Sequence, residues 1–110
     1  MNIQIFGKNK CFDTKKAERY FKERKIHYQR IDIIGVGLSP GEFRSIKSAV
    51  GIEAMIDQNA PGSEILEYLA YDADRENKLL ENPAFLKTPI VRNGKKATIG
   101  YSPEVWKNWE

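Results

Sequence analysis

Residues 2–14 read NIQIFGKNKCFDT, and this stretch decides the fold. Residues 2–6 form a short alternating run, which predicts a strand. A charged helical run starts at Asp13, so Cys11, the only cysteine of the chain, stands where a buried strand turns into a helix. A thiol at a helix N-terminus faces unpaired backbone N–H groups and the positive end of the helix dipole, and both favour the thiolate.

The position of Cys11 therefore has two interpretations. Helix N-termini lower cysteine pKa values to roughly 3.5–7.5, and lysines such as Lys15 and Lys16 add positive charge nearby in sequence. The alternative is a small buried apolar residue, because free cysteines are often interior. We favour a reactive thiol because of the place it occupies.

The rest of the chain continues in alternating elements. Apolar residues at Ala17, Tyr20 and Phe21 predict one helical face between Asp13 and about Lys25. A strand is predicted over 28–34, with Ile31 and Ile33 on one side, and a loop over 34–38. Three helices should follow: one capped by Ser39 and Glu42 and ended by Gly51, one starting at 61–63, and one from about 74 to before Pro83. Strands over 89–92 and 95–99 are joined by Asn93-Gly94, and Ser102 opens a last helix.

This order, β-α-β, a helical stretch and β-β-α, predicts an α/β domain with a four-stranded mixed sheet. Residues 1–110 are expected to form one domain, with a helical insertion at about 39–82. Gly35 and Gly37 superficially suggest a dinucleotide fingerprint, but they follow the second strand and Pro40 takes the place of the third glycine. That motif is rejected.

Composition excludes several classes of function. One cysteine excludes an internal disulfide, and one histidine, His27, leaves no usual zinc ligand set. No apolar stretch is long enough to span a membrane, and the net charge of +3 comes without an arginine-rich block, so neither membrane nor direct nucleic-acid binding is expected. The cysteine count suits a reducing cytoplasm.

Three local features resemble the thioredoxin and glutaredoxin fold. Residues 11–14 (Cys-Phe-Asp-Thr) occupy the place of the Cys-x-x-Cys motif, with Thr14 where the second cysteine would stand. Thr88-Pro89 begins the third strand, where that fold carries a cis-proline facing the thiol, and residues 100–105 lead from the hairpin into the last helix. The helical insert narrows the resemblance to the arsenate-reductase-related family, which includes Spx-like regulators, over essentially the whole chain.

The resemblance implies that Cys11 is the nucleophile of a site around this turn. Lys8, Asn9 and Lys10 precede it, and the two lysines would attract an anionic thiol such as glutathione. A cis Pro89 would offer strand-like backbone hydrogen bonds to a bound thiol substrate.

Thr14 has two equally weighted roles at this stage. Its hydroxyl is placed to donate a hydrogen bond to the Cys11 sulfur, or it merely caps the helix, a role for which Asp13 competes.

Departures from the family pattern concern the substrate. Arsenate reductases of this family hold the oxyanion with arginines, yet Thr88 stands directly before the aligned proline, Tyr101 stands before the last helix, and no arginine occurs between Arg44 and Arg75. A tetrahedral oxyanion is best held by planar guanidinium groups, so arsenate is not expected as the substrate.

Lys87, Arg92 and Tyr101 are weaker candidates for oxyanion binding. Lys87 and Arg92 are near enough in sequence to compensate, although Arg92 lies three residues past Pro89 on a strand and is expected to point away. Tyr101 aligns with an oxyanion ligand, but a ring packing at the helix start is the simpler expectation.

Two classes of function follow from the resemblance. The first is a cytoplasmic, thiol-dependent reductase with one nucleophilic cysteine, no bound cofactor, and glutathione, another small thiol or a redox protein as co-substrate. The second is a non-catalytic Spx-like module that binds a protein partner, as Spx-like regulators contact RNA polymerase. True arsenate reduction ranks last.

Overall fold

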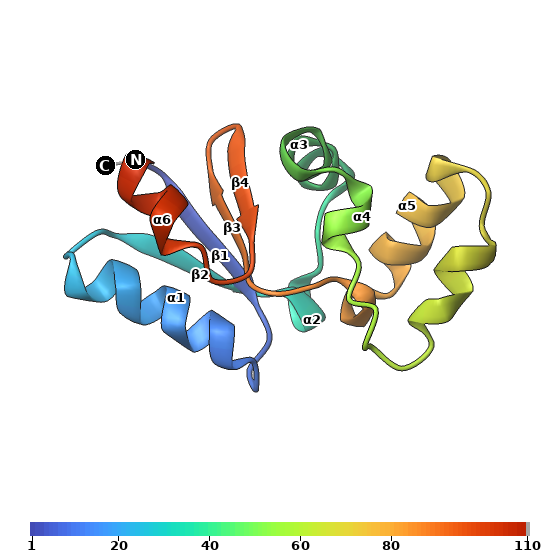
Figure 1. Cartoon of the computed structure of the whole chain (residues 1–110), viewed down its shortest axis with the longest axis horizontal. Helices are drawn as coiled ribbons and strands as arrows, with labels where there is room; N and C mark the ends of the chain where they lie inside the picture. The colour runs from blue at the N-terminus through green and yellow to red at the C-terminus, as the bar shows by residue number, and fades with distance from the viewer. Residues whose placement is uncertain (110) are drawn as a thin grey trace.

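The computed structural model describes residues 1–109. Its first half holds a strand–helix–strand unit, and its last quarter holds a hairpin and a closing helix (Figure 1). The elements are β1 (Ile3–Gly7), α1 (Phe12–Glu23), β2 (Tyr28–Asp32), α2 (Ile33–Val36), α3 (Pro40–Val50), α4 (Ile52–Met55), η1 (Ser63–Tyr68), α5 (Asp72–Glu81), η2 (Pro83–Phe85), β3 (Ile90–Asn93), β4 (Lys96–Ile99), α6 (Pro103–Trp106) and η3 (Lys107–Trp109). No helix within residues 1–109 has the length and apolar content needed to cross a membrane.

The four strands form one mixed sheet in the order β2-β1-β3-β4. β1 and β2 run parallel, with Gly7 opposite Asp32 at their carboxyl ends. β3 runs antiparallel to both β1 and β4. The predicted α/β architecture with a parallel unit followed by an antiparallel hairpin is confirmed.

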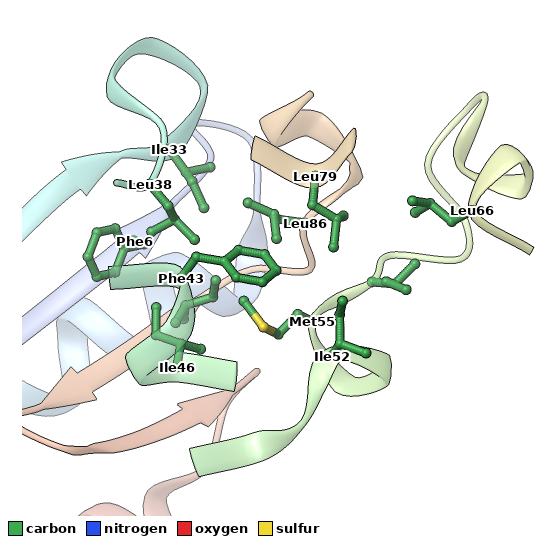
Figure 2. Close-up of a cluster of buried hydrophobic side chains, with 12 residues drawn as sticks. Phe6, Ile33, Leu38, Phe43, Ile46, Ile52, Met55, Leu66, Leu79 and Leu86 are labelled. Atoms are coloured by element: carbon green, nitrogen blue, oxygen red, sulfur yellow. The ribbon is translucent and has the colours of Figure 1, made fainter. Parts of the chain in front are cut away.

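Each face of the sheet has its own apolar core. On the α1 and α6 side, Trp106 is fully buried and its Nε1 donates a hydrogen bond to Thr98 Oγ1 at 2.8 Å. The residues of this core are Ile3, Ile5, Ala17, Tyr20, Phe21, Val91 and Trp106. The opposite core gathers side chains from the sheet and the middle helices around Phe43 and Met55 (Figure 2). The turn that carries Cys11 therefore follows a strand that is packed on both faces.

The second strand is shorter than predicted. It ends at Asp32, whose side chain accepts a hydrogen bond from Ile34 N and thereby caps the short helix α2, where we expected strand to 34 and then loop. Ile31 and Ile33 nevertheless pack into the same core. The Asp32 carboxylate accepts a backbone N–H of the next residues, and this bond favours a helical turn over continuation of the strand through the β-branched residues 33 and 34.

The hairpin turn is also displaced by one residue from its prediction. Asn93 pairs with Lys96, so the two turn residues are Gly94 and Lys95, not Asn93 and Gly94. Gly94 has φ 62°, the conformation that glycine favours at the first position of a type II′ hairpin turn.

The middle of the chain is helical as expected, with differences in detail. The capping box of α3 is present: Glu42 N donates to Ser39 Oγ at 3.1 Å, and Ser39 N donates to Glu42 Oε1 at 2.9 Å. α4 was not predicted, and the helix expected from 61–63 is a 3₁₀ helix, η1, in which Leu66 is buried but Ile65 is exposed. Residues 1–109 thus contain a run of short helices between β2 and β3.

Candidate functional site

A tight turn at the end of β1 places the thiol. Cys11 N donates a hydrogen bond to Lys8 O at 3.1 Å, and Cys11 itself is the N-cap of α1 with φ −86° and ψ 115°. The helix therefore begins at Phe12, one residue earlier than predicted, and neither Thr14 nor Asp13 is its cap. That correction leaves the Thr14 hydroxyl free for another role.

Thr14 is buried between the turn and the end of the strand, with 1% of its surface exposed. A Cβ on Gly7 would collide with the Thr14 side chain and lie 2.7 Å from its Oγ1, so the strand must end in glycine to admit this threonine. Thr14 Oγ1 makes no hydrogen bond of standard geometry within residues 1–109. A buried hydroxyl without a full partner, next to a thiol, is available to the sulfur.

The sulfur lies between hydrogen-bonding groups on two sides. Cys11 Sγ donates to Thr88 O at 3.6 Å, a long contact that suits the large sulfur atom. Burial alone would raise the pKa of the thiol, but the hydroxyls of Thr14 and Thr88 and the backbone N–H groups of Thr14 and Asp13 outweigh it. The pKa of Cys11 consequently lies below its ordinary value.

The contacts from α1 to the sulfur fall outside standard hydrogen-bond geometry. The Cys11 side chain makes no standard cap bond to the helix, and Thr14 Oγ1 has no standard partner within residues 1–109. They act mainly on the charged form, because a thiolate is an acceptor only and draws donors toward itself.

The peptide bond between Thr88 and Pro89 is cis, as the family resemblance implied. The segment that leads into it is held by backbone pairing with residues 55–57. Asp57 N donates to Phe85 O and Lys87 N donates to Met55 O, both at 2.8 Å. The Thr88 carbonyl that meets the thiol is thus supported from the helical middle of the chain.

Among the turn residues, Lys8 makes specific contacts. Its Nζ donates to Ala84 O at 3.0 Å and lies 3.8 Å from Asp57 Oδ2. This places Lys8 between the thiol turn and the 57 and 84 segments, with its charge partly neutralised. Asn9 and Lys10 are exposed in the turn.

Tyr101 packs in the way that the simpler expectation stated. Its ring meets the Trp106 ring edge-on at 5.6 Å between centroids, and Lys16 Nζ lies 5.5 Å from its centre. Together with Arg19 and Pro103 it borders an open groove of about 490 Å³ along α1. The ring is therefore turned toward α1 and α6.

The cations that were considered as substitutes for the oxyanion-binding arginines have other partners. Arg92 donates to Gln4 Oε1 at 3.2 Å and to Ser45 Oγ at 3.3 Å, so it points toward α3, as expected. Lys87 is exposed and borders a polar hollow with Asp57 and Gln58. The carboxylate of Asp57 stands beside Lys8 near the turn, and it would repel an anion.

Sequence reasoning missed Asp57, Ala84 and Phe12. The first two lie far along the chain from Cys11, and no local pattern pairs them with Lys8. Phe12 had a usable signal: it falls outside the helical face of Ala17, Tyr20 and Phe21, and the structure leaves it 80% exposed.

The chain matches known proteins over almost its whole length. Residues 6–109 match the model of the ArsC family. The global transcriptional regulator Spx 2 of Oceanobacillus iheyensis is 30% identical over 107 residues, covering 92% of this chain and 78% of the relative. The global transcriptional regulator Spx of Streptococcus agalactiae is 26% identical over 110 residues, covering 93% of this chain and 78% of that relative.

Among solved structures, an arsenate reductase from Vibrio cholerae has a TM-score of 0.86 at 20% identity, covering 98% of this chain and 97% of that one. At this identity the likeness shows a shared fold, and the predicted thioredoxin-like fold is confirmed.

Proposed function

The chain belongs to the ArsC family, and from this premise we propose that it is a thiol-dependent oxidoreductase with Cys11 as its single nucleophile. The observation that carries the proposal is the setting of the sulfur. Cys11 is the N-cap of α1, donates to the Thr88 carbonyl and has the unpartnered Thr14 hydroxyl beside it. These groups hold a thiol that loses its proton easily, which is what a nucleophile requires.

The reaction that one cysteine supports has three exchange steps, the last of which occurs between the released mixed disulfide and a second external thiol. The Cys11 thiolate attacks one sulfur of a substrate disulfide, a mixed disulfide forms, and the other sulfur leaves as a thiolate that takes a proton from water. An external thiolate then attacks the mixed disulfide and releases Cys11. A second external thiol completes the cycle, so two external thiols are oxidised to one disulfide while the substrate disulfide is reduced.

Glutathione, another small thiol or a redox protein would serve as the external reductant, and a reducing cytoplasm is the compartment that we propose. No bound cofactor is required by these steps.

The substrate is proposed to be something other than arsenate. Thr88 and Tyr101 occupy positions where the family resemblance implies arginines, Arg92 is engaged with Gln4 and Ser45, and a carboxylate, Asp57, stands beside Lys8. Without planar guanidinium groups around the thiol, a tetrahedral dianion lacks the charge-assisted bonds that hold it.

The test is reaction of the reduced protein with a nitrobenzoate disulfide, followed by release of the coloured thiolate. We expect rapid release from the native chain and background release from Cys11→Ser. In a parallel assay with arsenate, glutathione and glutaredoxin, we expect no turnover above background. Equal colour release from native chain and Cys11→Ser would overturn the proposal, and arsenate turnover would overturn its substrate restriction.

A second candidate is a non-catalytic regulatory module. It is favoured by the curated relatives, which are named global transcriptional regulators and are matched over 92–93% of this chain. Under this reading the chain binds RNA polymerase, and no disulfide forms within the chain because it has one cysteine. Co-purification of RNA polymerase with both the native chain and Cys11→Ser would favour the module, whereas failure of both to bind polymerase would exclude it.

A further inference from the structure

Three large apolar side chains stand exposed near the thiol end of the sheet. Phe12, the residue after Cys11, is 80% exposed, and Val36 and Ile34 on α2 are 76% and 52% exposed. Single exposed apolar residues are common on protein surfaces, but a group of them at one edge marks an interaction surface. The disulfide exchange described above does not itself use any of the three.

The sheet register brings these residues to the same edge. Gly7 pairs with Asp32 in parallel register, so the turn to Cys11 and Phe12 and the turn into α2 leave the sheet at the same end. Figure 1 shows α2 and the start of α1 at that end of the strands. η2 contacts α2, and its Ala84 carbonyl accepts the Lys8 hydrogen bond, so η2 links α2 to the turn that carries the thiol.

Cations outnumber acids in the turn and at the start of α1. Lys8 is paired with Asp57 and Lys16 with Asp13, whereas Lys10 and Lys15 are exposed and have no ion pair among residues 1–109. A partner that covers Phe12 therefore meets apolar surface bordered by cations, and acidic side chains on the partner would complement them.

We propose that Phe12, Ile34 and Val36 form a docking surface for a protein segment that presents a disulfide-bonded cysteine flanked by apolar and acidic residues. The inference rests on the proposed function and names its substrate class. It combines the nucleophile, the buried Thr14 hydroxyl that makes no hydrogen bond of standard geometry within residues 1–109, and the exposed apolar residues at the same end of the sheet. Glutathione would satisfy the lysines but gives no apolar side chain to cover Phe12.

The disulfide of the partner supplies both the sulfur that is attacked and the leaving group. The Cys11 thiolate attacks the partner cysteine sulfur, the Cys11–partner disulfide forms, and the sulfur formerly bonded to that cysteine leaves as a thiolate. Docking favours the first step because it converts an encounter between two solutes into a reaction within a complex.

The experiment uses three short peptides, each with one cysteine joined by a disulfide to a nitrothiobenzoate leaving group. Their sequences are Glu-Leu-Cys-Leu-Glu, Glu-Ser-Cys-Ser-Glu and Lys-Leu-Cys-Leu-Lys. The second-order rate of leaving-group release by the reduced, native chain is measured for each. We expect the leucine–glutamate peptide to react about fivefold faster than the serine peptide, because burial of leucine side chains contributes to binding. We expect it to outpace the lysine peptide as well.

Substitutions in the docking surface test whether it causes the preference for the leucine peptide. Phe12→Ser and Val36→Ser should each bring the ratio of leucine-peptide to serine-peptide rates toward one. Tyr68→Ser removes an aromatic ring of similar exposure, 82%, on η1, and should leave the ratio unchanged. Val36 and Phe12 lie on different helices, so failure of one variant to fold leaves the other as a test.

The outcomes separate this inference from the proposed function. If the native chain releases the leaving group from all three peptides at equal rates, the docking surface is wrong and the thiol chemistry stands. A preference that survives both Phe12→Ser and Val36→Ser also overturns the surface. If the chain reacts with none of the peptides and with no small disulfide, the proposed function fails and this inference falls with it.

Discussion

The surroundings of the Cys11 sulfur differ sharply from the positions that would hold an oxyanion. At the sulfur, Gly7 makes room for Thr14, and α1 begins directly after Cys11. The Thr88 carbonyl, which belongs to the cis peptide bond with Pro89, accepts a hydrogen bond from the thiol. At the anion positions the chain has Thr88, Tyr101 packed on Trp106, and Asp57 beside Lys8. Under the proposed function, activation of a thiol and binding of a tetrahedral anion are separable on one scaffold.

Substitution of Gly7 should disturb the packing around the sulfur most directly. Gly7→Ala places a methyl group into the Thr14 side chain, and overpacking of this kind costs about 1–3 kcal/mol of unfolding free energy. We expect urea denaturation to show that loss, together with slower Cys11 alkylation as the turn shifts. Gly41→Ala is the matched control, because nothing lies within 4 Å of its added Cβ and its stability should be maintained. Equal stability of Gly7→Ala and the native chain would contradict the close fit.

Introducing one arginine at an anion position tests whether a guanidinium group is what arsenate binding lacks. In Thr88→Arg, a guanidinium next to the thiol should let arsenate bind and slow Cys11 alkylation by about tenfold, the size of one charge-assisted contact. The native chain and the uncharged variant Thr88→Gln should show no protection. Protection of the native chain by arsenate would mean that the present anion positions already suffice.

Thr14 tests how the sulfur region works. Thr14→Val keeps the shape and removes the hydroxyl, so the pKa of Cys11 should rise and its alkylation at neutral pH should slow by about threefold, as for one modest hydrogen bond. Thr14→Ser retains the hydroxyl and should stay near the native rate. The hydroxyl has no such role if the valine variant keeps the native pH midpoint.

The smallest expected effect concerns stability and pH. The folded-state pKa of Cys11 is below its unfolded value, so ionisation stabilises the fold. This contribution is complete above the unfolded pKa and is lost as pH falls through the folded pKa. The native chain should therefore gain unfolding free energy relative to Cys11→Ala as pH rises from neutral toward the unfolded pKa, as measured by urea denaturation at several pH values. An unchanged difference across that window would contradict a lowered pKa.

Features that depend on local sequence were predicted best, in the sulfur region and at the anion positions alike. The strand-to-helix turn and the capping box at Ser39 were predictable because they depend on neighbours within a few residues, whereas the place of Thr88-Pro89 came from the family resemblance. The N-cap assignment, the end of β2 at Asp32 and the turn at Gly94 were misplaced by a residue or more, where several residues compete for one local role.

The remaining features depend on contacts between distant segments. Lys8 meets Ala84 and Asp57, and Thr14 is buried against Gly7, only because the sheet and the middle helices bring these segments together. Tertiary packing decides such contacts, and local periodicity carries no information about them.

The most direct test of the activated thiol is the pH dependence of Cys11 alkylation in the native chain, read by mass spectrometry against the same chain in denaturant. The sulfur contacts to Thr14, Thr88 and the start of α1 predict a native midpoint below the denatured one, with fast labelling at neutral pH. A native midpoint at or above the denatured value, with slow labelling, would contradict the account and leave Cys11 an inert residue of the turn.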